Sequence, residues 1–300
     1  MANWRGVELV HDNQNSLKRL TDEHVEQWKQ LEEFNLSGNP EIERVPDAVG
    51  NWERLKQFYL NDLPLVREVP NTIGAWKQLK VLHINNCALE RLPNEVEHLS
   101  NLNMVALNNN RLSELPRGIG SWHRVEKLFI NDNRLVTLPA EIGHMTSLQK
   151  LYLNNNQITE LPAEIAQLHE LDELYLTRNQ LVQLPDAIVQ CKSLGKLYLN
   201  ENAHLSALPE DLHSLQQLEI LHVNDCRLET LPASIHLLGK LKFVHLARNQ
   251  IQHIPREFTE FQELRVFETE ANPLSEQSLQ VVEQISKNLV AAWSFEVAGE

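Results

Sequence analysis

The chain has 300 residues and a formal net charge of −14, with 41 acidic side chains against 27 Lys and Arg. This excess of negative charge argues against general nucleic-acid binding, which depends on neutralising phosphates. No apolar stretch reaches the roughly 20 residues that a membrane span needs, and the N-terminus lacks the apolar core of a signal peptide. We therefore expect a cytoplasmic protein that binds neither nucleic acid nor membrane.

Residues 1–30 precede a repeating pattern and are expected to form an N-terminal cap. Thr21 can begin a helix that runs to about Gln30, because a threonine oxygen accepts one of the free N–H groups at a helix start. A repeat array without a cap exposes its apolar core and an unpaired strand edge at its end. A cap before the first repeat is therefore expected.

From residue 31 to residue 273, an Xaa-Pro pair recurs every 23 or 24 residues. The ten pairs are Val45-Pro46, Val69-Pro70, Leu92-Pro93, Leu115-Pro116, Leu138-Pro139, Leu161-Pro162, Leu184-Pro185, Leu208-Pro209, Leu231-Pro232 and Ile254-Pro255. A fixed period in the range of about 20–50 residues indicates a solenoid or a similar array. One copy cannot bury its own apolar face, so each copy needs neighbours on both sides.

One period predicts a short strand followed by a tight return segment. In residues 148–171, Leu151 and Leu153 point inward, while Lys150 and Tyr152 point outward, as in a strand with one buried face. The second half of the period has an apolar residue at every third position. That spacing suits short 3₁₀ or extended segments better than a long α-helix.

An asparagine ends most of the strands at the same position of the repeat. These corner asparagines are Asn39, Asn110, Asn133, Asn156, Asn179, Asn202, Asn249 and Asn272. Because asparagine carries both donors and an acceptor, a stacked column of them can satisfy buried backbone groups where the chain bends. Leu63, Cys87 and Cys226 occupy the position elsewhere, and we expect a local rearrangement at Leu63. We interpret all three cysteines, including Cys191, as reduced core residues.

The pattern LxxLxLxxNxLxxLPxxIxxL, repeated about eleven times between Leu31 and Pro273, resembles the leucine-rich-repeat family. The 23-residue length and the Leu-Pro pair resemble its Ras-suppressor-like class. The resemblance implies an α/β repeat solenoid over residues 31–273. It would be a curved horseshoe of about eleven strands with a parallel concave sheet, short 3₁₀ or extended convex segments, and a protein partner on the concave face.

Residues 274–300 are expected to form a C-terminal helical cap. Ser275 suits the start of a helix whose apolar face carries Leu279, Val282 and Ile285. The sequence NPLS at residues 272–275, followed by this helix, also resembles the end of the repeat domain in bacterial type III effectors. That resemblance leaves open a second location, secretion into a host cell without a cleaved signal peptide.

Outward strand positions are where the fold does not dictate the residue, and four consecutive repeats place an aromatic side chain there. The aromatic column is Phe129, Tyr152, Tyr175 and Tyr198. The flanking polar residues are Lys127, Lys150 and Lys196 two positions earlier, Asn154 and Asn200 two positions later, and Arg178 one position further on. Tyr and Arg are enriched in interface hot spots, and a rigid sheet lowers the ordering cost of binding. Aromatic residues also favour strands for packing reasons alone, and the asparagines can form a ladder that supports the turns.

We predict that this column anchors a protein partner whose carboxylates pair with the flanking cations. The expected protein is a monomeric, non-enzymatic scaffold with no cofactor, and the chain lacks GxSxG, HExxH, P-loop and CxxC motifs. His222 and His245 lie on the same outward column, where they can tune binding with pH. Three alternatives remain: a secreted bacterial effector that binds a host protein, a metal-dependent enzyme that uses these two histidines, and a structural or designed array without a partner.

Overall fold

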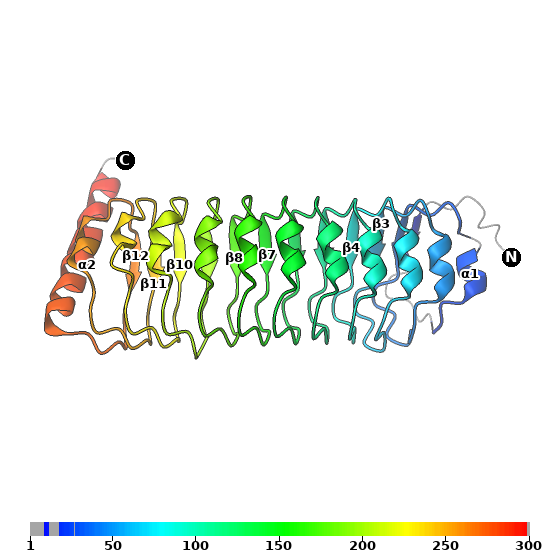
Figure 1. Ribbon diagram of the computed structural model, residues 1–300, viewed down its shortest axis with the longest axis horizontal. Coiled ribbons are helices and arrows are strands. Elements are labelled where there is room, and N and C mark those ends of the chain that lie inside the picture. The colour runs from blue at the N-terminus through cyan, green and yellow to red at the C-terminus, as the bar shows by residue number, and fades with distance from the viewer. Residues whose placement is uncertain (1–8, 12–17, 27, 299–300) are drawn as a thin grey trace. The chain divides into compact units, whose positions relative to one another are not determined.

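The computed structural model describes residues 9–11, 18–26 and 28–298. The chain divides into two compact units, Met1–Gln157 (unit 1) and Ile158–Glu300 (unit 2). Much of the expected N-terminal cap lies outside the described residues. Each unit repeats one short strand and one 3₁₀ helix, and within each unit Figure 1 shows the 3₁₀ helices on one side of the strands.

Unit 1 holds one short α-helix, seven strands and five 3₁₀ helices within its described residues. They are β1 (Leu9–His11), α1 (Asp22–Glu26), β2 (Glu33–Asn35), η1 (Asp47–Asn51), β3 (Gln57–Tyr59), η2 (Asn71–Ala75), β4 (Val81–His83), η3 (Asn94–His98), β5 (Met104–Ala106), η4 (Arg117–Ser121), β6 (Lys127–Phe129), η5 (Ala140–His144) and β7 (Lys150–Tyr152). Consecutive strands pair in parallel, with equivalent repeat positions side by side from β1 to β7. Strand β1 falls in the range expected to be a cap, and helix α1 ends at Glu26, before the expected Gln30.

Unit 2 continues the same alternation and ends in a long α-helix. Its elements are η6 (Ala163–Gln167), β8 (Glu173–Tyr175), η7 (Asp186–Gln190), β9 (Lys196–Tyr198), η8 (Glu210–Ser214), β10 (Ile220–His222), η9 (Ile235–Leu237), β11 (Phe243–His245), η10 (Arg256–Glu260), β12 (Val266–Glu268) and α2 (Glu276–Ala298). Strands β8 to β12 also pair in parallel and in register. The predicted parallel sheet and short 3₁₀ segments are therefore confirmed in both units.

The proline of each Xaa-Pro pair sets the entry to the return segment. Pro139 has φ −68° and ψ 150°, and the 3₁₀ helix begins at the next residue. A proline ring holds φ near this value, and its missing N–H is not needed at a helix start. The apolar residues behind the strand and the 3₁₀ helix are buried, as Leu151 and Ile142 show. The core of each unit therefore lies between its strands and its 3₁₀ helices.

A corner asparagine joins three backbone segments. The Nδ2 atom of Asn133 donates to the carbonyl oxygens of Leu107 at 2.9 Å and Ile130 at 3.4 Å. Its Oδ1 atom accepts the N–H of Leu112 in the preceding repeat at 3.0 Å. The residue just before it, Asp132, has a left-handed backbone with φ 57°. The predicted role of the asparagine column is confirmed.

Repeat length decides where an asparagine is needed. The corners Asn39, Leu63 and Asn202 are each followed by one extra residue before the next Xaa-Pro pair. In each of these repeats the extra residue closes a turn, so an N–H donates to the corner carbonyl: Ile42 to Asn39 at 3.1 Å, Val66 to Leu63 at 3.1 Å, and Leu205 to Asn202 at 3.0 Å. In the 23-residue repeats the equivalent N–H relies on the amide oxygen of the next corner. The three corners without asparagine, Leu63, Cys87 and Cys226, are those that follow such a turn.

Helix α2 begins as predicted, and of its expected apolar face Ile285 is buried, Val282 is half-buried and Leu279 is exposed. The N–H of Ser278 donates to the Ser275 hydroxyl at 3.3 Å, which is the expected cap. Leu279, expected on the apolar face, is 54% exposed, whereas Val281 and Ile285 are buried. The buried hydroxyl of Ser278 accepts the N–H of Ile254 at 2.9 Å and so fixes the rotation of the helix. None of the described helices combines the length and the apolar character that crossing a bilayer requires.

Candidate partner-binding surface

The outward side chains of the strands, here called the strand face, carry the aromatic residues in two stacked pairs. In unit 1 the rings of Phe129 and Tyr152 lie 4.7 Å apart at an interplanar angle of 25°. In unit 2 the rings of Tyr175 and Tyr198 lie 4.4 Å apart at 8°. All four side chains are half-buried, so each ring keeps part of its surface exposed to solvent. The continuation of the column from Tyr152 to Tyr175 stays a prediction.

The aromatic row of unit 2 extends into the two histidines. The ring of His222 meets Tyr198 edge-on at 4.8 Å and lies 3.9 Å from the ring of His245. His245 Nδ1 lies 2.6 Å from Glu268 Oε2. Burial lowers the pKa of His222 to about 4, and the neighbouring His245 adds to the shift. His222 is therefore an uncharged member of the row at neutral pH.

The lowered pKa of His222 predicts a loss of stability in acid. The ordinary pKa of a histidine is 6.5, and that of His222 in the folded protein is about 4. Between these two pH values His222 is protonated in the unfolded chain but stays neutral in the folded protein. Stability contributed by the neutral ring is therefore present above pH 6.5 and is lost as the pH falls towards 4. The expected effect is on the order of 1 kcal/mol, because the partly exposed ring is screened by solvent.

Urea unfolding at a series of pH values measures this effect. The variant His222→Gln should flatten the dependence between pH 6.5 and pH 4, and the exposed His204→Gln in the same unit serves as the control. Equal pH profiles for the wild type and His222→Gln would contradict the prediction.

Two of the predicted cations of unit 2 already have partners within the unit. Lys196 Nζ lies 3.1 Å from Glu173 Oε1, and the hydroxyl of Tyr175 donates to Glu173 Oε2 at 3.1 Å. The side chain of Glu173 is 5% exposed, and its hydrogen bond raises the pKa of Lys196. Arg178 Nε donates to Glu201 Oε2 at 2.8 Å. Glu173 is thus a buried carboxylate that orients both an aromatic ring and a cation, a role that the sequence analysis missed.

The lysines of unit 1 are arranged differently. Lys127 and Lys150 face one another in register on β6 and β7, beside the Phe129–Tyr152 pair. Within the described residues Lys127 makes no ion pair. Lys127 is therefore the predicted cation of unit 1 that can accept a carboxylate from a partner.

The flanking asparagines form the ladder that was the alternative interpretation. In unit 1 the N–H of Asn154 donates to Asn131 Oδ1 at 2.8 Å, and Asn131 bonds to Asn108 in the same way at 2.9 Å. In unit 2 the N–H of Asn224 donates to Asn200 Oδ1 at 2.8 Å. The amide oxygens of this ladder therefore support the backbone after each strand, and contact with a partner would be additional.

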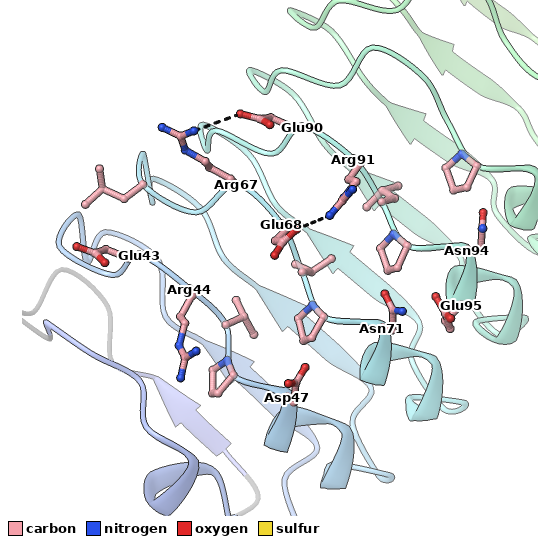
Figure 2. Close-up of a pocket in the computed structure, with 18 of the residues that line it drawn as sticks. Glu43, Arg44, Asp47, Arg67, Glu68, Asn71, Glu90, Arg91, Asn94 and Glu95 are labelled. Atoms are coloured by element: carbon pink, nitrogen blue, oxygen red, sulfur yellow. Dashed lines mark hydrogen bonds and ion pairs between the residues drawn. The ribbon is translucent and has the colours of Figure 1, made fainter.

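A groove on the flank of unit 1 was not predicted. It has a volume of 1390 Å³ and lies over the Val45, Val69 and Leu92 positions of successive Xaa-Pro pairs. Figure 2 shows two ion pairs across it, Arg67 with Glu90 at 3.7 Å and Arg91 with Glu68 at 2.9 Å. The alternation of Glu43, Arg67 and Glu90 one period apart was the available sequence signal. Exposed pairs of this kind contribute little stability.

The cysteines and histidines offer little chemistry in the described part of the chain. Burial raises the pKa of Cys191 to about 12 and those of Cys87 and Cys226 to about 11, so all three thiols stay protonated. No group of three or more His, Cys, Asp or Glu side chains that could hold a metal ion occurs among the described residues. His222 and His245 come together as predicted, with Glu268 beside one of them.

Comparison with known proteins identifies the repeat. Residues 71–156 match the family model described as "Leucine-rich repeat region", and residues 146–188 match the model described as "Leucine Rich repeats (2 copies)". No curated protein matches the sequence.

Solved structures give the same fold. A TDR receptor aligns with a TM-score of 0.79 and 23% identity, over 90% of this chain and 48% of its own. The PEPR1–AtPEP1 complex aligns with a TM-score of 0.66 and 25% identity, over 85% and 40%. The leucine-rich repeat domain of the type III effector XopL aligns with a TM-score of 0.51 and 26% identity, over 64% and 75%. The chain thus spans less than half of the TDR receptor chain and of the chain in the PEPR1–AtPEP1 structure.

Proposed function

We propose that this chain, which belongs to the leucine-rich-repeat family, is a non-enzymatic scaffold that binds a protein through the strand face. The observation that carries the proposal is the pair of stacked, half-exposed aromatic couples, Phe129–Tyr152 and Tyr175–Tyr198. Tyrosine is enriched among interface hot spots, and rings held in place by a sheet lose little freedom on binding. The structure of PEPR1 with AtPEP1 supports a peptide or protein as the class of ligand.

The proposal gives the flanking residues unequal roles. Lys127, which makes no ion pair within the described residues, is suited to pair with a carboxylate of the partner, and we propose Lys150 as a contact beside it. Lys196 and Arg178 lie beside Glu173 and Glu201, so their first role is to hold the surface in shape. Asn154 and Asn200 support the backbone, and His222 and His245 extend the aromatic row. We also propose that the protein is a monomer and is located in the cytoplasm.

Replacing one ring of each stacked pair tests the function. The double variant Tyr152→Ala with Tyr175→Ala should weaken binding to a captured partner at least tenfold, because each substitution removes an exposed half of a stacked couple. Affinity capture with the immobilised chain, followed by titration of the recovered partner, measures the effect. Tyr59→Ala is the matched control, since Tyr59 occupies the same strand position on β3 outside the two pairs.

The double variant should keep its circular dichroism spectrum and melting temperature, because both tyrosines point away from the core. Undiminished affinity in the folded double variant, or an equal loss in Tyr59→Ala, would count against the aromatic pairs as the binding site.

The likeness to the XopL repeat domain favours a second candidate function, an effector that binds a host protein. Its test is independent of the strand face. Residues 1–30 fused to a reporter should be exported by a type III secretion system if the chain is such an effector. Retention of the reporter would remove this candidate and leave the scaffold proposal intact.

A further inference from the structure

Three apolar side chains lie in register on the strand face of unit 2, where the preceding strands carry charge. Ile220 on β10 pairs in register with Phe243 on β11, which pairs with Val266 on β12. All three are half-buried, and the same position holds Lys196 on β9. Helix α2 lies against η10 and β12, and neither β10 nor β11 is among the elements that its described residues contact. The exposed parts of the three half-buried side chains are therefore open to an external partner.

The imidazole row borders these side chains directly. His222 and His245 belong to the same strands as Ile220 and Phe243, two residues further along each chain. Tyr198 closes the row at its other end, 4.8 Å from His222. We call this set the neutral patch: Tyr198, Ile220, His222, Phe243, His245 and Val266. Burial holds the pKa of His222 at about 4, so this ring adds no charge to the patch near neutral pH.

Three ion pairs within unit 2 border the neutral patch. Lys196 pairs with the buried Glu173 at 3.1 Å, and Lys242 pairs with Glu219 at 3.0 Å. On the far side Arg248 pairs with Asp225. Glu268 lies 2.6 Å from His245. A charged group brought against this surface would lose water beside six side chains that already have counter-ions, which makes burial of a charge there unfavourable.

We propose that the neutral patch binds an uncharged peptide segment that places an aliphatic or aromatic side chain on Phe243. This inference rests on the proposed function and specifies the chemistry of the partner at unit 2. The three ion pairs beside the patch offer no unpaired counter-ion to a charged segment, while the exposed parts of Ile220, Phe243 and Val266 gain from contact with apolar groups. Unit 1 offers different chemistry at the same strand position, where Lys127 on β6 would favour an acidic group.

The test uses a random nonapeptide library displayed on phage and selected against the intact chain at neutral pH. Enriched peptides should share a core of Leu, Ile, Phe or Trp and lack Asp, Glu, Lys and Arg within that core. A synthetic peptide of the consensus sequence should bind the double variant Ile220→Ser with Phe243→Ser at least tenfold more weakly. Val81→Ser is the matched control, because Val81 is a half-buried apolar residue at the same strand position in unit 1.

A second measurement uses the wild-type protein alone and therefore does not depend on whether the serine variant folds. The affinity of wild-type protein for the consensus peptide should be nearly the same at low and high salt, because no ion pair forms on binding. Full affinity of the consensus peptide for a folded serine variant would overturn the inference. A strong salt dependence, or acidic or basic residues in the core of those peptides that lose affinity for the serine variant, would also overturn it. A library that yields no binder would overturn it as well.

The outcomes also separate this inference from the proposed function. Peptides that lose affinity for Tyr152→Ala with Tyr175→Ala but keep it for the serine variant would support the aromatic pairs and refute the neutral patch. The reverse outcome is also informative. If the peptides lose affinity for the serine variant, but the tyrosine double variant captures the partner as well as the wild type does, the result would refute the aromatic pairs and support the neutral patch.

Discussion

Replacing Asn133 by alanine should lower the free energy of unfolding more than any exposed substitution in the chain. The change removes the acceptor of the Leu112 N–H and the donors to the carbonyl oxygens of Leu107 and Ile130, all of them buried. A buried group left without a partner costs roughly 1–3 kcal/mol, so the expected loss is about 2–5 kcal/mol. Urea unfolding followed by circular dichroism measures it.

The cysteine variant at the same position separates the two functions of the amide. Cys87 shows that a thiol can donate to a corner carbonyl, since its Sγ lies 3.1 Å from the carbonyl oxygen of Leu60. Asn133→Cys should therefore keep a weak donor but lose the acceptor of Leu112, which gives a stability between those of the wild type and Asn133→Ala. The exposed Asn71→Ala, at the start of η2, is the control and should change stability by less than about 0.5 kcal/mol. Equal stabilities for Asn133→Ala and Asn71→Ala would show that the corner amide is dispensable.

The second large effect is expected at Gly118, where two neighbouring 3₁₀ segments approach closely. A Cβ atom at this position would lie 2.6 Å from the carbonyl oxygen of Asn94 and 3.0 Å from the Glu97 nitrogen. Because both neighbours are backbone atoms, a side-chain rotation cannot relieve the overlap. Gly118→Ala should therefore destabilise the protein by about 1–3 kcal/mol, the range for overpacking a close contact.

Gly239 provides the matched control for this substitution. A Cβ atom there meets nothing within 4 Å, although the residue also lies next to a 3₁₀ helix. Gly239→Ala should leave stability unchanged or raise it by up to about 1 kcal/mol, because alanine has less freedom than glycine in the unfolded chain. A melting temperature for Gly118→Ala at or above that of Gly239→Ala would contradict the packing argument.

The features that depend on one residue type at a fixed repeat position could be predicted from the sequence. The burial of Leu151, the outward direction of Tyr152 and the start of a 3₁₀ helix after Pro139 all follow from a pattern that recurs in every copy. Recurrence also predicts that equivalent residues become neighbours, which the stacking of Tyr175 on Tyr198 confirms.

The features that depend on one particular neighbour could not be predicted. Glu173 is buried because Lys196 and Tyr175 both bond to it, and the period alone does not reveal such a meeting. Leu279 was placed on the wrong face because the rotation of α2 follows from one hydrogen bond between Ser278 and Ile254. The left-handed corner has a signal where it holds Asn or Asp, but Arg178 and Glu201 adopt the same backbone without one.

The turn that follows Asn202 has a consequence for how such a chain can change over generations. Because this turn gives the Leu205 N–H the Asn202 carbonyl oxygen as its acceptor, the next corner does not need an asparagine and can hold Cys226. Cys226 should therefore be inherited together with the extra residue of the turn. Deletion of that residue alone would orphan the Leu205 amide, whereas deletion combined with Cys226→Asn would restore the bonding of an ordinary copy. Arrays that gain or lose the extra residue after one corner should therefore also change the residue at the next corner, between asparagine and another residue type.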